Sequence, residues 1–255
     1  GRLTVGIRSM EVLYYEQKRY FMVITGAFLN GLFIIIGSII GLFFRNIRNK
    51  TKETVLTVIG LTVAVLGIQL SITSTNFIIM VISLVIGTII GEWLNIEGWF
   101  EKVGYKVESL FRKQKTTGKI AEGFITASLI FVIGSIAVVG AIDSGVKNDH
   151  TILITKGIID GFMSIFLTST LGIGVILSAI PVFLYEGIIA LSATTIEHIV
   201  PKEVFTQFIQ EMSATGGIMI LAIGLNVAKI ISIRVANLLP SLIVVGVVVF
   251  LMQMI

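Results

Sequence analysis

Residues 22–44 read MVITGAFLNGLFIIIGSIIGLFF, an apolar stretch that contains no charged residue. About 20 residues of α-helix cross the hydrocarbon core of a bilayer, so this stretch predicts a transmembrane helix. The whole chain of 255 residues has the same character, since 55% of its residues are hydrophobic and 13% are charged. Soluble domains carry about 25% charged residues. The sequence therefore predicts an all-α, polytopic transmembrane helix bundle.

Further apolar segments of similar length raise the expected number of spans to about eight. We place them at 22–44, 54–73, 76–94, 121–142, 152–171, 174–196, 212–230 and 236–254. Residues 95–120 form the longest polar connection, and 97–115 are expected to form an amphipathic surface helix. Trp93 and Trp99 suit the membrane interface. The junction at 171–174 has no charge, so it is either re-entrant or a tight cytoplasmic turn.

Lysine and arginine predict the orientation. They concentrate in residues 45–52, 102–119 and 229–234. Cytoplasmic loops carry an excess of these residues, so we expect the three segments in the cytoplasm and both Met22 and Ile255 outside. Residues 1–21 are polar and lack the apolar core of a signal peptide, and we interpret them as an extension that need not be native.

Short matches between distant spans predict an internal repeat. Spans one to three, in residues 22–94, would recur as spans four, seven and eight within 121–255, with the hairpin 152–196 inserted. The matching positions are Gly26, Gly37 and Ser38 with Gly123, Gly134 and Ser135, Gly60 and Gly67 with Gly217 and Gly224, and Asn76 with Asn237. Under the predicted orientation the matched spans run in opposite directions, as in many secondary transporters. Chance similarity between glycine-rich spans is the alternative.

Ionisable residues inside spans are costly and mark candidate sites. Lys156 and Asp160 are four residues apart and share one helix face. Glu186 follows Pro181, which can kink its helix. Asp160 and Glu186 could approach each other and bind a proton or a cation, or Lys156 could neutralise Asp160. The alternatives are a charge pair that only fixes packing, and a Glu186 that reaches out of the span.

Uncharged polar residues and glycines form a second group of candidates. Asn30, Gln69 and Asn226 lie within apolar spans, where amide side chains either line a site or bridge helices. Thr168, Ser169 and Thr170 precede Gly172 and Gly174, a pattern typical of an unwound segment or a hairpin turn. Pairs of glycines four residues apart allow close helix contact, within the chain or between subunits. These pairs are Gly37 and Gly41, Gly87 and Gly91, and Gly157 and Gly161.

Signatures of enzymes are missing from the sequence. It contains no cysteine, and its two histidines, His150 and His198, fall in separate predicted loops. We therefore expect no catalytic residue, no metal site and no cofactor, and we expect the chain not to be an enzyme. The formal net charge of +4 reflects the loops and does not indicate nucleic-acid binding.

Several motifs resemble those of a known family. They are Thr155-Lys156 through Asp160-Gly161, Ser169 through Val175, Ser178 through Pro181, Thr215-Gly216-Gly217, Ala222 through Asn226, and Asn237 through Pro240. Together they resemble the YdfK/YqgA-type bacterial membrane proteins, which carry a domain of unknown function. The resemblance implies a multi-pass protein of the bacterial inner membrane that starts near Met22. Two departures are the stretch Gly140 through Gly145 and Glu186, where the family pattern leads us to expect Gln, which weakens a mechanism that needs a charge there.

These observations lead to two functional hypotheses. The first is a transporter or channel for a small solute or ion, with its site near mid-membrane between the repeats. The second is a membrane scaffold or regulator that binds a partner through glycine-rich helix faces, and a homodimer would use the same faces. A water-filled cavity reaching Asp160 would favour transport, whereas a closed bundle around Lys156 and Asp160 would favour the scaffold.

Overall fold

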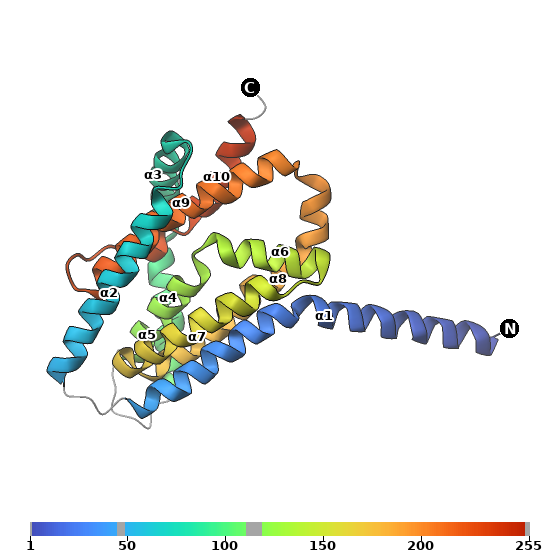
Figure 1. Ribbon diagram of the computed structural model, residues 1–255, viewed down its shortest axis with the longest axis horizontal. Coiled ribbons are helices and arrows are strands. Elements are labelled where there is room, and N and C mark those ends of the chain that lie inside the picture. The colour runs from blue at the N-terminus through green and yellow to red at the C-terminus, as the bar shows by residue number, and fades with distance from the viewer. Residues whose placement is uncertain (1, 45–48, 111–118, 253–255) are drawn as a thin grey trace.

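The computed structural model describes residues 2–44, 49–110 and 119–252. Within these ranges the chain is helical, and Figure 1 shows the helices packed into one elongated bundle from which the N-terminal part of α1 extends. The longer helices are α1 (Arg2–Phe43), α2 (Asn49–Ser71), α3 (Phe77–Leu94), α7 (Thr151–Leu171), α8 (Ala179–Ile199) and α9 (Lys202–Val227). Shorter elements are α4 (Ile96–Leu110), α5 (Lys119–Val132), α6 (Ser135–Lys147), η1 (Ile173–Ser178), η2 (Val235–Leu238) and α10 (Pro240–Met252).

The described residues contain seven helical segments that are long and apolar enough to cross a membrane, or eight if α5 and α6 together form one span. Large apolar side chains face outward on these helices, among them Val65, Ile89 and Phe162, each 64% exposed. Such side chains on every side of a bundle are stable against lipid rather than water. The polytopic helical bundle predicted from the sequence is therefore confirmed.

Helix boundaries differ from the predicted spans at several points; α1 begins at Arg2 rather than at 22, and spans four and seven differ further. The span predicted at 121–142 is divided into α5 and α6, which are bent by 63° relative to each other. Gly134 lies at the break with φ +155°, a conformation open to a residue without a Cβ. The span predicted to start at 212 starts at Lys202 instead. The first turns of this helix carry many polar side chains. Their low average hydropathy hides the helix from a hydropathy-based prediction.

The 171–174 junction is a tight turn that continues into a further helix. Helix α7 ends at Leu171, Gly172 adopts φ +88°, and the short helix η1 leads directly into α8. A Cβ on Gly174 would collide with the backbone of Ile120, so the turn packs closely against the start of α5. Residues 173–199 together have the length of one span, so the turn separates two spans.

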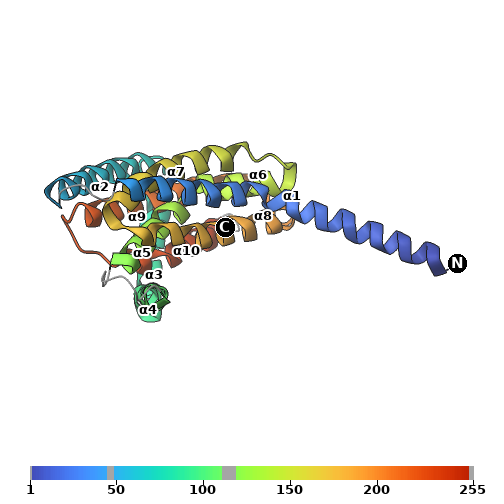
Figure 2. The same ribbon diagram turned by 90° about the horizontal axis from the view of Figure 1, so that it is seen from below.

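The predicted surface helix is present as α4, which Figure 2 shows below the main bundle. It covers residues 96–110, and the remainder of the predicted segment, 111–115, lies outside the described residues. Trp93 and Trp99 are 84% and 60% exposed near its start. Residues 45–48 and 111–118, which carry part of the basic charge behind the predicted orientation, also lie outside the described part of the chain.

Glycines bring α1 and α7 into parallel contact along their length. A Cβ on Gly37 would collide with the carbonyl of Gly161, and one on Gly41 would lie 2.5 Å from the carbonyl oxygen of Ile165. Because both contacts advance along the two helices in the same direction, α1 and α7 run parallel. All three predicted glycine pairs make close contacts inside the chain. Gly157 and Gly161 pack against Phe33 of α1, and Gly87 and Gly91 of α3 pack against Ser241 of α10 and Asn237 of η2.

Helices α2 and α9 are antiparallel and make two contacts of the same kind. A Cβ on Gly60 would lie 2.6 Å from the carbonyl oxygen of Gly224, and one on Gly224 would lie 2.5 Å from that of Gly60. A Cβ on Gly67 would lie 2.6 Å from the carbonyl oxygen of Gly217, and the reverse distance is 2.7 Å. Figure 1 shows the two helices side by side. The four glycines form a close and reciprocal interface.

Candidate functional site

Four polar side chains from three helices meet inside the bundle. The amide Nδ2 of Asn30, on α1, donates a hydrogen bond of 2.7 Å to Oε1 of Glu186, on α8. On α7, Lys156 forms an ion pair with Asp160, and its Nζ lies 3.3 Å from the same Oε1 of Glu186. Asn30 and Glu186 are fully buried, and Lys156 and Asp160 are each 7% exposed. We call this group the buried polar cluster.

The helix packing positions each member of the cluster. Lys156 and Asp160 are one turn apart on α7 and therefore project from the same face. Gly157 lies beside them, and a Cβ there would be 2.9 Å from the Cα of Asn30, so this glycine lets α1 approach. Asn30, Asp160 and Glu186 all lie near the middle of their membrane-length segments. The cluster therefore lies far from both ends of the bundle.

The cluster is unbalanced in both charge and hydrogen bonding. With every group ionised, one ammonium faces two carboxylates, which leaves one negative charge in excess. Oδ1 of Asn30 and Oε2 of Glu186 are buried, and no described residue donates to either oxygen. A buried charge or acceptor without a partner costs free energy. The arrangement can therefore accept a positively charged species or a hydrogen-bond donor.

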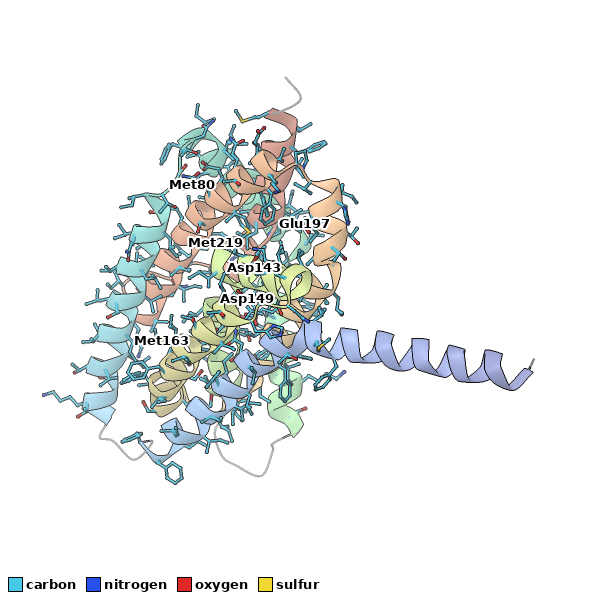
Figure 3. The ribbon with its side chains drawn as sticks, turned by 45° about the vertical axis from the view of Figure 1, so that its right-hand side comes forward. Met80, Asp143, Asp149, Met163, Glu197 and Met219 are labelled. Carbon is cyan, nitrogen blue, oxygen red and sulfur yellow. The ribbon has the colours of Figure 1, made fainter. Side chains whose placement is uncertain are left out.

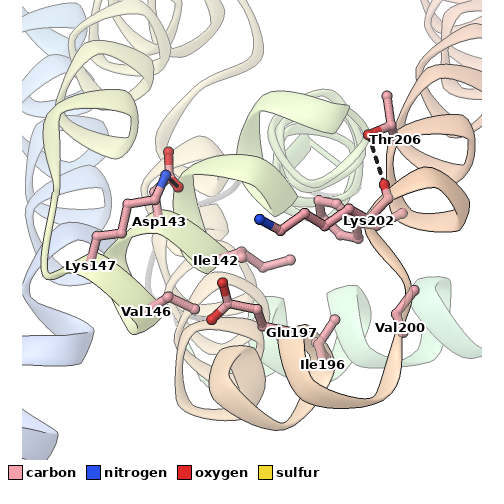
Figure 4. A pocket seen from close by; sticks show the side chains of 10 residues that line it. Ile142, Asp143, Val146, Lys147, Ile196, Glu197, Val200, Lys202 and Thr206 are labelled. Carbon is pink, nitrogen blue, oxygen red and sulfur yellow. Dashed lines mark hydrogen bonds and ion pairs between the residues drawn. The ribbon is translucent and has the colours of Figure 1, made fainter.

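Three cavities in the described part of the chain are lined by residues outside the cluster. One of about 270 Å³ is lined by residues of α6, α8 and α9 (Figure 4), including Asp143, Lys147, Glu197 and Lys202. Asp143 and Lys147 form an ion pair of 2.7 Å, and the side chains of Glu197 and Lys202 point into the space between the helices. Figure 3 shows Asp143 and Glu197 near each other in this region. Another is an apolar groove between α1 and α8, and the third lies near Glu97 and Asn226.

A further buried carboxylate, outside the cluster, was not predicted from the sequence. Glu211 of α9 is fully buried, and its Oε1 accepts hydrogen bonds of 2.9 Å from the backbone amides of Thr75 and Asn76. Oε1 also accepts a bond from the Thr75 hydroxyl, and Oε2 accepts one of 2.7 Å from the Ser74 hydroxyl. The carboxylate thus satisfies the amides that precede α3, a stabilising place for a negative charge. The only sequence signal was an acidic residue next to an apolar run.

Glu97 of α4 plays a similar part at the start of the last span. Its Oε2 accepts a hydrogen bond of 2.9 Å from the amide of Ala236, and its own amide donates one of 2.7 Å to Oδ1 of Asn237. Burial raises the pKa of Glu97, and the bond from Ala236 and the charge of Arg234 partly oppose this rise. The neighbouring carboxylates Glu101 and Glu92 act in the same direction as burial.

The other predicted site residues do not join the cluster. Gln69 is exposed on α2, and Asn226 bonds to the backbone of Ile233, where it holds the turn after α9. Ser169 and Thr170 donate to backbone carbonyls of their own helix. Thr168 is buried against α1, and its Cβ would lie 2.8 Å from a Cβ on Gly41. Of the nine predicted residues, the structure thus brings together Asn30, Lys156, Asp160 and Glu186.

Histidine and acidic residues do not converge on a metal site in the part of the chain that is described. His150 precedes α7, and its Nδ1 lies 2.7 Å from the hydroxyl of Ser144. His198 lies in the last turn of α8.

Comparison with known proteins gives matches over most of the chain. Residues 25–250 match the family described as "Protein of unknown function (DUF554)". The chain is 36% identical to the uncharacterised membrane protein YdfK of Bacillus subtilis (strain 168), over 89% of this chain and 96% of that protein. It is 26% identical to the uncharacterised protein YqgA of Escherichia coli (strain K12), over 86% of this chain and 93% of that protein. No solved structure matches the chain.

These matches confirm the family resemblance inferred from the sequence motifs. One relative is named as a membrane protein, and this chain has several helices long enough to cross a membrane. The protein is a multi-pass membrane protein that belongs to the DUF554 family.

Proposed function

We propose that the protein is a carrier for a small ion or solute and that the buried polar cluster is its binding site. The observation that carries this proposal is the cluster itself. It places three ionisable side chains at mid-span with one excess negative charge and two buried oxygens that lack donors. Ionisable residues inside spans are expensive and mark ion or proton pathways in membrane proteins.

The glycine contacts between α2 and α9 support an inverted repeat, which is the architecture of many carriers. In the proposed repeat, Gly60 is equivalent to Gly217 and Gly67 to Gly224. A two-fold relation between the halves must convert the contact of Gly60 with Gly224 into a contact of Gly217 with Gly67. Both contacts are present at closely similar distances. The halves differ at Gly37 and Gly134, since α1 continues through Gly37 whereas the chain breaks at Gly134.

In this proposal the repeat comprises residues 22–94 and 121–255, and α7, η1 and α8 form the inserted hairpin. The cluster then lies between the first half, which contributes Asn30, and the hairpin, which contributes the three charges. Because the four side chains of the cluster are buried, we interpret the observed arrangement as a closed state. Alternating access would open it toward one side at a time. We place the protein in the bacterial inner membrane, with its basic loops in the cytoplasm.

One observation favours the second candidate, a scaffold or regulator without transport activity. The cluster is closed, as a purely structural charge network would be. The glycine faces proposed for partner binding, however, pack against other helices of the same chain, which argues against their use by a partner or a second copy. The carrier therefore remains the leading proposal, and access of water to the cluster distinguishes the two.

A thiol-labelling experiment tests access without knowledge of the solute. The chain has no cysteine, so a single introduced cysteine is the only target. Ser164→Cys is a small change at a buried position one turn from Asp160, where the serine hydroxyl bonds to the Asp160 carbonyl. We expect membrane-impermeant maleimide to label Ser164→Cys in membrane vesicles. Asn148→Cys, at an exposed position after α6, is the positive control.

Labelling of Ser164→Cys supports a site that opens to water. Complete protection from both sides of the membrane, with Asn148→Cys labelled, would contradict the carrier and favour the scaffold. A screen of amino acids, organic acids and monovalent cations by thermal shift would then identify solutes for flux assays in proteoliposomes. Asp160→Asn should abolish the flux of any such solute and leave expression unchanged, and undiminished flux would refute the role of Asp160.

A further inference from the structure

We propose that Glu186 carries a proton on Oε2 in the observed arrangement and that this site exchanges a proton with water when the carrier opens. The exchange step rests on the proposed function, whereas the bound proton rests on the geometry of the cluster alone. Each part therefore has its own test.

The first argument is the charge balance of the cluster. Lys156 pairs directly with Asp160 on the same helix, so these two charges compensate each other. Glu186 is fully buried and would add a further negative charge. An uncompensated charge in a low-dielectric interior is unstable, and a buried acid instead takes up a proton. One proton brings the whole cluster to zero net charge.

The second argument is the hydrogen-bond inventory. Oε1 of Glu186 accepts a hydrogen bond from Nδ2 of Asn30 and lies near Nζ of Lys156. Oε2 accepts no hydrogen bond from the described residues. A neutral carboxyl group has one O–H donor, so a proton on Oε2 turns an unpaired acceptor into a donor. Oδ1 of Asn30, which also lacks a donor, belongs to the amide group already bonded to this carboxyl group.

A proton fits this position better than a metal ion does. A cation bound at Oε1 would face the ammonium of Lys156, whose Nζ is only 3.3 Å away. Calcium takes 6–8 oxygen ligands, and magnesium also requires a complete shell. The cluster has few oxygens that are not already engaged, and no cluster residue lines any of the three cavities described above. A proton needs neither the ligands nor the space.

Charges on the surrounding helices do not change this balance. Helix α1 contributes the uncharged Asn30, and α7 contributes Lys156 and Asp160. On α6, Asp143 and Lys147 pair with each other beside the cavity that Glu197 lines. Glu122 of α5 lines a different cavity with Glu97, and η1 has no ionisable side chain. Tyr185 precedes Glu186 on α8 and is neutral at physiological pH.

Infrared spectroscopy of the purified full-length protein tests the bound proton directly. A protonated carboxyl group has a C=O stretching band well separated from those of carboxylates and amides. We expect this band at neutral pH in the wild type. It should shift when glutamate is ¹³C-labelled by cell-free synthesis and stay in place when aspartate is labelled.

Two variants assign the band among the glutamates. Glu186→Gln should abolish it. Glu211→Gln should retain it, because Glu211 lies outside the buried polar cluster and four donors already bond to its two oxygens. Glu97→Gln, at a half-buried position with a raised pKa, should also retain the Glu186 band. If Glu186→Gln does not fold, the isotope shift of the wild type still decides between glutamate and aspartate.

Absence of the band, a shift with labelled aspartate, or persistence of the band in Glu186→Gln would each overturn the proposal. A bound proton together with full protection of Ser164→Cys would support the proton site and contradict the carrier. Labelling of Ser164→Cys without the band would support the carrier and reject the proton on Glu186.

Discussion

Nζ of Lys156 on α7 lies 3.3 Å from Oε1 of Glu186 on α8, while the same ammonium pairs with Asp160 on its own helix. One cation thus joins two helices of the hairpin, and the amide of Asn30 extends the contact to α1. This shared ammonium determines how the cluster should respond to substitution.

Lys156→Met should strongly destabilise the protein, because it leaves buried carboxyl groups without their cation. Removal of one partner of a buried ion pair costs about 3–5 kcal/mol. Lys156→Met combined with Asp160→Asn should cost clearly less, since the double variant has lost both charges of the pair. Unfolding in detergent measures both effects. Additive losses in the double variant would show that the two charges are not coupled, and Lys147→Met of the exposed pair on α6 is the control.

Gly37→Ala should weaken the contact between α1 and α7. The added methyl group would collide with the Gly161 backbone, and overpacking costs about 1–3 kcal/mol. A lower thermal midpoint measures the effect. Gly187→Ala is the matched control, since no atom lies within 4 Å of a Cβ at this helical position, and alanine there should be neutral or stabilising. Equal behaviour of the two variants would contradict the packing shown here.

Glu211→Ala should loosen the turn between α2 and α3. The change removes the charged acceptor of the Thr75 and Asn76 amides, and a hydrogen bond to a charged group contributes about 1.5–3 kcal/mol. Hydrogen exchange at these two amides should accelerate markedly. Glu203→Ala, at an exposed position in the first turn of the same helix, should leave the exchange unchanged.

Glu97→Gln should make stability less sensitive to pH. Since the pKa of Glu97 in the folded protein is above its unfolded value, its stabilising contribution is complete below the unfolded pKa and is lost as the pH rises through the folded pKa. Glutamine stays neutral and still accepts the bond from Ala236. The variant should therefore have a higher Tm than the wild type at neutral pH, and the difference should vanish in acid. An unchanged difference across the titration would refute the shift.

Much of the fold was predictable because the bilayer makes hydropathy a direct measure of span length. The sequence predicted α3 at 76–94 and α7 at 152–171, and the structure places them at Phe77–Leu94 and Thr151–Leu171. The start of α9 and the break at Gly134 were missed. The start of α9 depends on the hydrogen bonds of Glu211, and the break depends on the φ angle of one glycine. Average hydropathy gives no information on either.

The candidate site was predictable only in part. Lys156, Asp160 and Glu186 stood out because charges are rare in apolar spans, whereas Gln69 and Asn226 carried a similar signal and lie elsewhere. Helical spacing placed Lys156 beside Asp160, but which residue of another helix would meet them depends on the rotation and depth of each helix.

The sequence alone therefore determined that the chain is a membrane helix bundle and that Lys156, Asp160 and Glu186 lie inside its spans, because the bilayer penalises each charge individually. Only the tertiary structure decided that Lys156 contacts the carboxyl groups of both Asp160 and Glu186, and that Asn30 bonds to Glu186. Those contacts result from glycine-mediated packing between helices, and the approach of two backbones is a property of the pair rather than of either segment.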